Sequence, residues 1–232
     1  MKYKKVVKGK FIERPNRFIA RVMIDGKAET VHVKNTGRCR ELLLPDSTVY
    51  LAVSDNPARK TKYDLVGVEK KRRGKPDLMI NMDSQAPNGA AEEWLKNGNL
   101  FSSEAVVRRE VKYGKSRFDF YIEDKDRRAF LEVKGVTLEN DGTAMFPDAP
   151  TERGVKHMRE LMECLRDGYE AYILFVIQMK EITLFRPNCE MHREFAEALR
   201  EAQQAGVRII AVDCAVTDSS MIIEDFVEIN LT

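Results

Sequence analysis

The sequence contains no apolar stretch long enough to span a membrane. Its longest apolar run covers only residues 171–177, whereas a membrane-spanning helix needs about 20 such residues. A signal peptide is not visible either, because Lys8, Lys10 and Glu13 interrupt any apolar segment that could follow the basic start of the sequence. We therefore expect a cytoplasmic protein with no membrane partner.

The sequence also lacks paired cysteines. Its four cysteines, Cys39, Cys164, Cys189 and Cys214, are scattered, and no two of them form a CxxC motif. A chain of 232 residues can bury a core without disulfides, so reduced thiols are expected. Cys189 and His192 have a spacing known from metal sites, but no second pair accompanies them. Surface or core roles are therefore favoured over a zinc site.

The whole chain has almost no net charge, because its 39 basic and 37 acidic side chains sum to only +2. The two parts of the chain differ sharply, however. Residues 1–83 hold 20 basic and 10 acidic side chains, and the remainder holds 19 basic and 27 acidic ones. The basic first part is typical of a domain that contacts a polyanion.

The first 83 residues have the pattern of a small β-barrel. Strands are expected over residues 6–12, 18–24, 28–33, 48–53 and 63–69. Asp25-Gly26 is a strong hairpin signal, and residues 38–44 are expected to form a short helix that Pro45 stops. This order predicts a five-stranded OB-like barrel, although other small barrels share it.

A change in pattern at residues 70–88 predicts a linker, because these residues are basic and turn-prone. We therefore divide the chain into an OB-like domain, residues 1–83, and an α/β domain, residues 84–232. In the second domain, helices are expected over 89–97, 152–167 and 191–205, and strands over 106–113, 117–122, 129–138, 171–177 and 207–212. Thr151 is the expected N-cap of the middle helix. The apolar run 171–177 predicts a central strand of an α/β sandwich with a mixed sheet.

Three charged residues on two neighbouring strands form a candidate active site. Strand alternation places Glu132 and Lys134 on one face. On the preceding strand it separates Asp119 from three apolar side chains, Phe118, Phe120 and Ile122. If the strands form a hairpin, Asp119 and Glu132 converge on a hard cation such as Mg²⁺ or Mn²⁺. Lys134 would then orient a water or stabilise the charged transition state of phosphodiester hydrolysis.

The spacing of this triplet is weak on its own. An acid-x-Lys pattern also begins at Asp25, Glu110 and Glu123, without the same strand context. The alternative is that Asp119, Glu132 and Lys134 form cross-strand ion pairs on a solvated sheet face. Spacing alone favours that alternative.

Five motifs together carry a family resemblance. They are Arg14-Pro15-Asn16-Arg17-Phe18, Asn35-Thr36-Gly37-Arg38, Tyr113-Gly114-Lys115-Ser116-Arg117-Phe118-Asp119, Glu132-Val133-Lys134-Gly135-Val136-Thr137-Leu138 and Phe146-Pro147-Asp148-Ala149-Pro150-Thr151-Glu152-Arg153-Gly154. On these motifs the chain resembles the sugar fermentation stimulation protein A family over nearly its whole length.

The resemblance implies a prokaryotic, cytoplasmic, DNA-binding protein linked to regulation of sugar (maltose) utilisation. It also implies an OB-like domain followed by a domain resembling PD-(D/E)xK restriction-endonuclease-like nucleases. In that pattern Asp119 stands for the first acid, and Glu132 and Lys134 for the E-x-K pair. One departure is that Phe118, not proline, precedes Asp119. A second acid often supports the metal in such proteins, and the candidates are Glu92, Glu93, Glu104 and Glu110.

Basic residues in both domains are candidate DNA contacts. Arg14, Arg17 and Arg38 lie in the basic barrel and are covered by the family motifs. Arg153 and His157 would lie in the first turns of a helix, where phosphates are attracted, although solvated surface positions are the alternative.

These residues predict largely nonspecific, backbone-directed DNA binding, because no helix-turn-helix reader is visible. The alternative function is an active Mg²⁺-dependent DNA phosphodiesterase that uses Asp119, Glu132 and Lys134. A sugar-binding or sugar-modifying enzyme is a third reading, and it has only the family's name behind it. No small-molecule cofactor is indicated, and the oligomeric state, a homodimer included, stays open.

Overall fold

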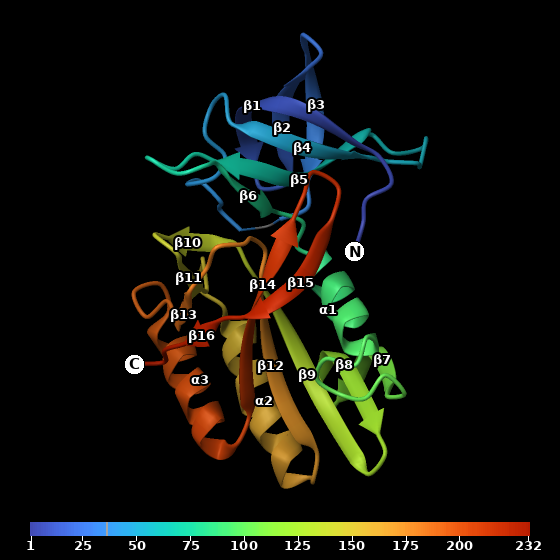
Figure 1. Cartoon of the computed structure of the whole chain (residues 1–232), viewed down its shortest axis with the longest axis vertical. Helices are drawn as coiled ribbons and strands as arrows, with labels where there is room; N and C mark the ends of the chain where they lie inside the picture. Colours follow the sequence, from blue (N-terminus) through green and yellow to red (C-terminus); the bar gives the residue numbers. More distant parts are fainter. Residues whose placement is uncertain (36) are drawn as a thin grey trace.

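Five strands of the N-terminal part close into a barrel in the computed structural model, which describes residues 1–35 and 37–232 (Figure 1). The strands are β1 (Val6–Asn16), β2 (Ile19–Ile24), β3 (Lys27–Val33), β4 (Thr48–Val53) and β5 (Tyr63–Lys70). Strand β1 lies between β2 and β4, and a parallel pairing of β3 with β5 closes the barrel. This arrangement confirms the predicted OB-like barrel. A further strand, β6 (Leu78–Asn81), pairs with β5 inside the segment expected to be a linker.

The prediction of a short helix over residues 38–44 is wrong. This segment forms turns, in which the main-chain N–H groups of Leu42 and Leu43 both donate to the carbonyl of Cys39 at 3.2 and 3.0 Å. Cys39 itself has a φ of 45°, which a right-handed helix excludes. Cys39 and Leu42 are nearly fully buried, so the barrel core sets the path of this segment.

The C-terminal part is built on a six-stranded mixed sheet. Its order is β15 (Met221–Phe226), β14 (Arg208–Val216), β12 (Glu170–Ile177), β9 (Arg127–Val136), β8 (Ser116–Asp124) and β7 (Val106–Tyr113). Strand β12 lies between β9 and β14 and runs parallel to both. Its residues 171–177 are all buried, which confirms the predicted central strand.

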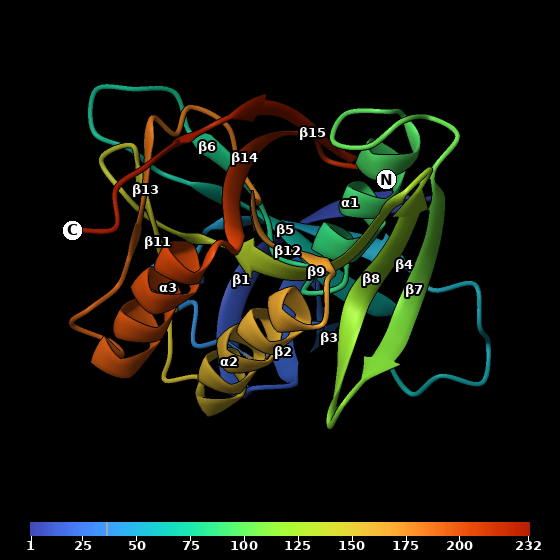
Figure 2. The same cartoon turned by 90° about the horizontal axis from the view of Figure 1, so that it is seen from below.

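Three helices cover the two faces of this sheet. Helix α1 (Ala86–Lys96) lies on one face, and α2 (Glu152–Arg166) and α3 (Arg193–Ala205) lie on the other (Figure 2). Thr151 caps α2 as predicted, since its Oγ1 accepts a hydrogen bond from Gly154 N–H at 3.1 Å. Among the described residues, no helix is long and apolar enough to cross a membrane.

A second, four-stranded sheet was not predicted. Its strands are β10 (Leu138–Asn140), β11 (Thr143–Phe146), β13 (Leu184–Pro187) and β16 (Glu228–Ile229). Strands of two to four residues are too short to show an alternating pattern, so the sequence carries little signal for them.

Buried hydrogen bonds hold the barrel against the C-terminal sheet. Gln178, directly after β12, donates through Nε2 to the carbonyls of Asn81 and Asp83 at 3.0 and 3.1 Å and to Asn81 Oδ1 at 3.1 Å. Asn81 N–H returns a bond to the carbonyl of Gln178 at 2.9 Å. The end of β12 is thereby fixed to the end of β6, so the two domains are locked at this point.

An ion pair at the start of β12 makes stability depend on pH. Arg127 donates to the Glu170 carboxylate through Nε at 2.7 Å and Nη2 at 2.9 Å. These bonds outweigh burial and lower the pKa of Glu170 to about 2. Since an unfolded Glu has a pKa of about 4.3, ionised Glu170 stabilises the fold above that pH. This stabilisation is lost as the pH falls through the folded-state pKa.

We expect Glu170→Gln to lower the free energy of unfolding by about 2 kcal/mol at pH 7. The difference from the unaltered protein should be small at pH 2, the folded-state pKa, where about half of Glu170 is protonated. Urea denaturation at the two pH values measures both. Glu201→Gln, at an exposed position of α3, is the control and should have little effect. A deficit that is equally large at both pH values would contradict the ion-pair explanation.

Candidate active site and arginine groove

Asp119 occupies a gap between two strands. The β8–β9 ladder ends at the pair Phe120–Leu131, so the next main-chain N–H of β9 has no partner from β8. The Asp119 carboxylate fills this place: Oδ2 accepts a hydrogen bond from Val133 N–H at 2.8 Å. Its Oδ1 accepts a second bond from Asn88 Nδ2 of α1, also at 2.8 Å. The carboxylate is therefore held in one position by a strand and a helix.

The expected position of Phe118 is wrong. Alternation placed it with Phe120 and Ile122, but its ring lies against Phe130 and His157 on the side of α2, with centroids 5.5 and 5.8 Å apart. Phe120 and Ile122 belong to the core beneath α1. The regular two-residue period fails here because β8 leaves the ladder at Asp119.

Glu132 is a buried carboxylate with one unused oxygen. Its side chain accepts a hydrogen bond from Lys134 Nζ at 2.6 Å and contacts His157 Nδ1, both through Oε1. Oε2 is buried and has no hydrogen-bond partner among the described residues. Since buried polar atoms are nearly always paired, this oxygen could accept a bond from a water or coordinate a cation.

Burial and neighbouring charges shift the pKa values of both carboxylates. Burial raises the pKa of Asp119, and the charge of Glu132 raises it further. Burial would also raise the pKa of Glu132, but the Lys134 charge and the bond from His157 outweigh it and hold that pKa below its usual range. A divalent cation would relieve the repulsion between the two. The donor set of hard carboxylate oxygens fits Mg²⁺ or Mn²⁺.

His157 lies in this cluster and not on the surface. Its side chain is buried, and its Nε2 accepts a hydrogen bond from Arg153 Nε at 3.3 Å. Nδ1 therefore carries the proton and donates to Glu132. The helical period of the sequence could have predicted that His157 is buried. The buried positions of this helix, Gly154, His157, Met158 and Leu161, follow the i, i+3, i+4, i+7 pattern.

The upstream glutamates proposed as extra ligands have other partners or lie exposed. Glu92 pairs with Lys96 and Arg109, Glu93 with the N-terminal amine and Glu110 with Arg117, and Glu104 is exposed. The residue of α1 that reaches the site is instead Asn88, through its bond to Asp119. Sequence reasoning missed it because only acids were considered at this position.

The barrel carries a groove of about 320 Å³, called the arginine groove below. It is lined by Arg14, Pro15, Asn16, Arg17, Gly37, Arg38 and Arg40. Thr36, which belongs to the motif beginning at Asn35, lies outside the described residues. Arg17 and Arg38 are exposed, and the Arg17 guanidinium lies 4.7 Å from the centre of the Phe18 ring. The groove thus presents positive charge beside an exposed aromatic ring.

Arg14 has a different place from the other arginines. Its guanidinium donates to four main-chain carbonyls, those of Arg17, Asn35, Gly37 and Arg38, at 2.7–2.9 Å. These bonds use its terminal nitrogens to shape the two loops that flank the groove. Arg14 is therefore a positioning residue for the arginine groove, whereas Arg17 and Arg38 face solvent.

One further group of possible metal ligands occurs in the described ranges 1–35 and 37–232, formed by Glu152, His192 and Glu194. His192 Nδ1 accepts a hydrogen bond from Thr151 N–H at 3.2 Å, so neutral His192 carries its proton on Nε2. That proton faces Glu152, with 3.6 Å between the nitrogen and the carboxylate. His192 therefore connects the starts of α2 and α3 and offers no free lone pair to a metal.

Two family models match the chain. Residues 12–75 match the model described as the SfsA N-terminal OB domain. Residues 85–220 match the model described as the sugar fermentation stimulation protein RE domain.

Relatives and a solved structure are similar over the full length. Proteins named sugar fermentation stimulation protein homolog from Clostridium beijerinckii and Ruminiclostridium cellulolyticum are 56% and 57% identical over 231 residues, covering 100% of this chain and of each relative. A structure described as that of Pyrococcus furiosus SfsA in complex with Ca²⁺ has a TM-score of 0.87 and 30% identity. It covers 99% of this chain and 98% of its own.

Proposed function

This chain belongs to the sugar fermentation stimulation protein family, and from that membership we propose that it is a DNA-binding protein that grips the phosphate backbone. The observation that carries the proposal is the arginine groove, in which Arg17, Arg38 and Arg40 are exposed on a barrel with a strong excess of basic residues. Binding of this kind is the proposed molecular basis of the family's link to sugar (maltose) utilisation.

The proposed binding is largely independent of DNA sequence. Arginine contacts to phosphates fix position but do not read bases. Helices α2 and α3 pack against each other and onto the sheet and the strands beside it, so neither is free to enter a major groove. Arg153 is exposed in the first turn of α2 and is the proposed phosphate contact nearest to Glu132, to which it connects through His157.

Arg17→Ala and Arg38→Ala are each expected to lower DNA affinity and to reduce the slope of log K against log salt by about 0.9, since each releases one phosphate contact. Fluorescence anisotropy with a short duplex at several salt concentrations measures the slope. Arg193→Ala, at an exposed position of α3 paired with Glu197, is the matched control and should leave the slope unchanged. A flat salt response of the unaltered protein would remove the basis for this proposal.

A second candidate function is metal-dependent cleavage of the bound DNA. It is favoured by one specific observation, the buried and unpaired Oε2 of Glu132. Asp119 and Glu132 would hold the cation. The Ca²⁺ complex of the Pyrococcus furiosus protein supports a divalent-cation site in this family. A cation bound there supplies a Lewis acid for a phosphate oxygen and lowers the pKa of a bound water.

The residues around the carboxylates suit this chemistry. Lys134 Nζ lies 2.6 Å from Glu132 and is mostly shielded from solvent, so it can offset negative charge that develops on a phosphate. Asn88 and Val133 N–H orient the Asp119 carboxylate. His157 orients Glu132 in the same way. These hydrogen bonds hold both carboxylates in fixed positions, which supports the proposal that they bind a cation beside a phosphate and an attacking water.

A further inference from the structure

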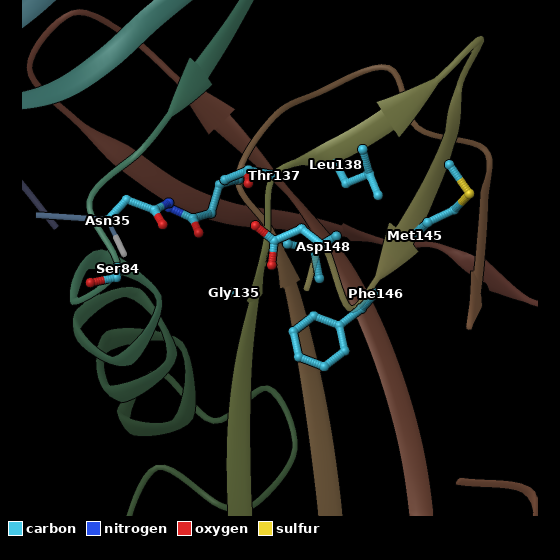
Figure 3. Close-up of a pocket in the computed structure, with 10 residues that line it drawn as sticks. Asn35, Ser84, Gly135, Thr137, Leu138, Met145, Phe146 and Asp148 are labelled. Carbon is cyan, nitrogen blue, oxygen red and sulfur yellow. The ribbon is translucent and has the colours of Figure 1, made fainter. Parts of the chain in front are cut away.

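A cavity of about 100 Å³ lies where the barrel, the linker and the C-terminal domain meet, and it is called the interdomain cavity below (Figure 3). It is lined by Asn35, Ser84, Gly135, Val136, Thr137, Leu138, Met145, Phe146, Asp148 and Gln178. A single water needs about 10–15 Å³ on the same measure. The cavity therefore has room for a group much larger than one water.

The interdomain cavity directly follows the candidate active site along β9. Gly135 lines it and is the next residue after Lys134, which bonds to Glu132. Neighbouring Cα atoms are about 3.8 Å apart. A strand whose phosphate lies at Lys134 therefore has its own base or the next one within reach of the cavity.

The cavity also adjoins the arginine groove. A Cβ placed on Gly37, which lines the groove, would lie 2.4 Å from Oδ2 of Asp148, which lines the cavity. The barrel backbone and Asp148 are thus in direct contact. DNA held by Arg17 and Arg38 on one side and by the Glu132 site on the other would pass this cavity.

The lining has a polar side and an apolar side. Figure 3 shows Asn35, Ser84 and Thr137 to one side of the Asp148 carboxylate, and Leu138, Met145 and the Phe146 ring to the other. No basic side chain is among the lining residues that the structure describes. A phosphate inside the cavity would meet the Asp148 carboxylate and no cationic group of the lining, so an anion does not fit this cavity.

Gln178 gives the cavity a fixed hydrogen-bond acceptor. Its Nε2 is occupied by the carbonyls of Asn81 and Asp83 and by Asn81 Oδ1, which sets the direction of the amide. Its Oε1 lies 2.6 Å from where a Cβ on Gly135 would be, so only glycine leaves this oxygen room. An acceptor held this way suits an exocyclic amino group or a ring N–H.

We propose that the interdomain cavity takes a nucleobase from a DNA strand bound between the arginine groove and the Glu132 site. A nucleobase combines apolar faces with a polar edge, which matches the two sides of the lining. Asp148, Asn35 and Gln178 meet the polar edge, and Phe146, Leu138 and Met145 contact the faces. Proteins that hold a base outside the stack use this combination of contacts. The proposal rests on DNA binding as the proposed function.

The test uses oligonucleotides that carry one 2-aminopurine, whose fluorescence is quenched by stacking and rises when the base leaves the stack. With Ca²⁺ present, we expect binding to raise the fluorescence at one position of the strand. Ser84→Trp places a bulky ring at an exposed residue of the lining and should abolish this rise. Ser103→Trp, exposed in another loop, is the matched control and should keep it.

Anisotropy of the same complexes separates this proposal from DNA binding itself. Ser84→Trp should leave overall affinity within about threefold, because phosphate contacts dominate it. Asp148→Asn keeps the side chain's size and should weaken binding of free 2-aminopurine deoxyriboside by about tenfold, a second and independent variant. Binding of the free nucleoside without any rise in the oligonucleotides would assign the site to free nucleosides and overturn the DNA-strand assignment.

Normal DNA affinity with no fluorescence rise at any position, and no nucleoside binding, would overturn the cavity proposal while leaving the proposed function intact. Absence of DNA binding in the anisotropy measurement would overturn both. The two failures are therefore distinguishable in one set of titrations.

Discussion

Replacing Glu132 with glutamine is expected to weaken Mn²⁺ binding by about 100-fold or more, since a direct ligand should matter more than the residues behind it. The change removes the charge that faces the cation and sets a neutral amide beside the Lys134 ammonium. Isothermal titration or the electron paramagnetic resonance signal of free Mn²⁺ measures the affinity. If DNA is cleaved in Mg²⁺ or Mn²⁺, cleavage should be lost in Glu132→Gln and in Lys134→Ala.

The matched control is Glu123→Gln, on β8 of the same sheet, where the carboxylate forms a partly exposed ion pair with Arg108. It should bind Mn²⁺ as the unaltered protein does. Because a bound ligand stabilises the folded state, Mn²⁺ should also raise the melting temperature of the control but not of Glu132→Gln. Equal Mn²⁺ affinity in both variants would show that Glu132 is not a metal ligand.

Replacing His157 with alanine is expected to lower Mn²⁺ affinity by about 10- to 100-fold, although His157 is not itself a proposed ligand. The imidazole holds Oε1 of Glu132 and thereby leaves Oε2 directed away from protein partners. Without it, the buried carboxylate is free to rotate and loses a donor. Titration with Mn²⁺ measures the loss.

His157→Asn separates positioning from packing. The asparagine amide N–H can reach the place of Nδ1–H, so this variant should recover much of the Mn²⁺ affinity. Like alanine, asparagine loses the packing of the imidazole ring in the core. Phe118, whose ring lies against His157, provides the contrast: Phe118→Leu should reduce stability while changing Mn²⁺ affinity little. If asparagine and alanine at position 157 weaken metal binding equally, the histidine acts through packing alone.

The sequence was sufficient for the main elements and for part of the candidate site. The barrel strands, the central strand β12 and the cap Thr151 followed from alternation, apolar runs and capping chemistry. Alternation also placed Glu132 and Lys134 together, because β9 pairs regularly with β12 throughout this region.

The positions of Phe118, Asn88 and Arg14 could not be predicted, because they depend on tertiary contacts that sequence periodicity does not encode. Phe118 departs from the expected face because β8 leaves the β9 ladder at Asp119. Asn88 reaches Asp119 from a helix 31 residues upstream, a contact set by how α1 packs on the sheet. Arg14 was expected among the DNA contacts, but carbonyls of two loops occupy its guanidinium, and those loops meet only in the folded barrel.

The bond between Asp119 and Val133 N–H gives this carboxylate a role in the fold that is separate from its proposed role as a metal ligand. It satisfies a strand N–H that would otherwise be buried without a partner, so a chain that had lost all chemistry would still pay for its removal in stability. Glu132 Oε2 has no comparable duty in the fold. Asp119 therefore uses both of its oxygens in the fold, whereas Glu132 uses only Oε1, through Lys134 and His157, and an aspartate at position 119 alone would not be evidence of metal chemistry in a descendant of this protein.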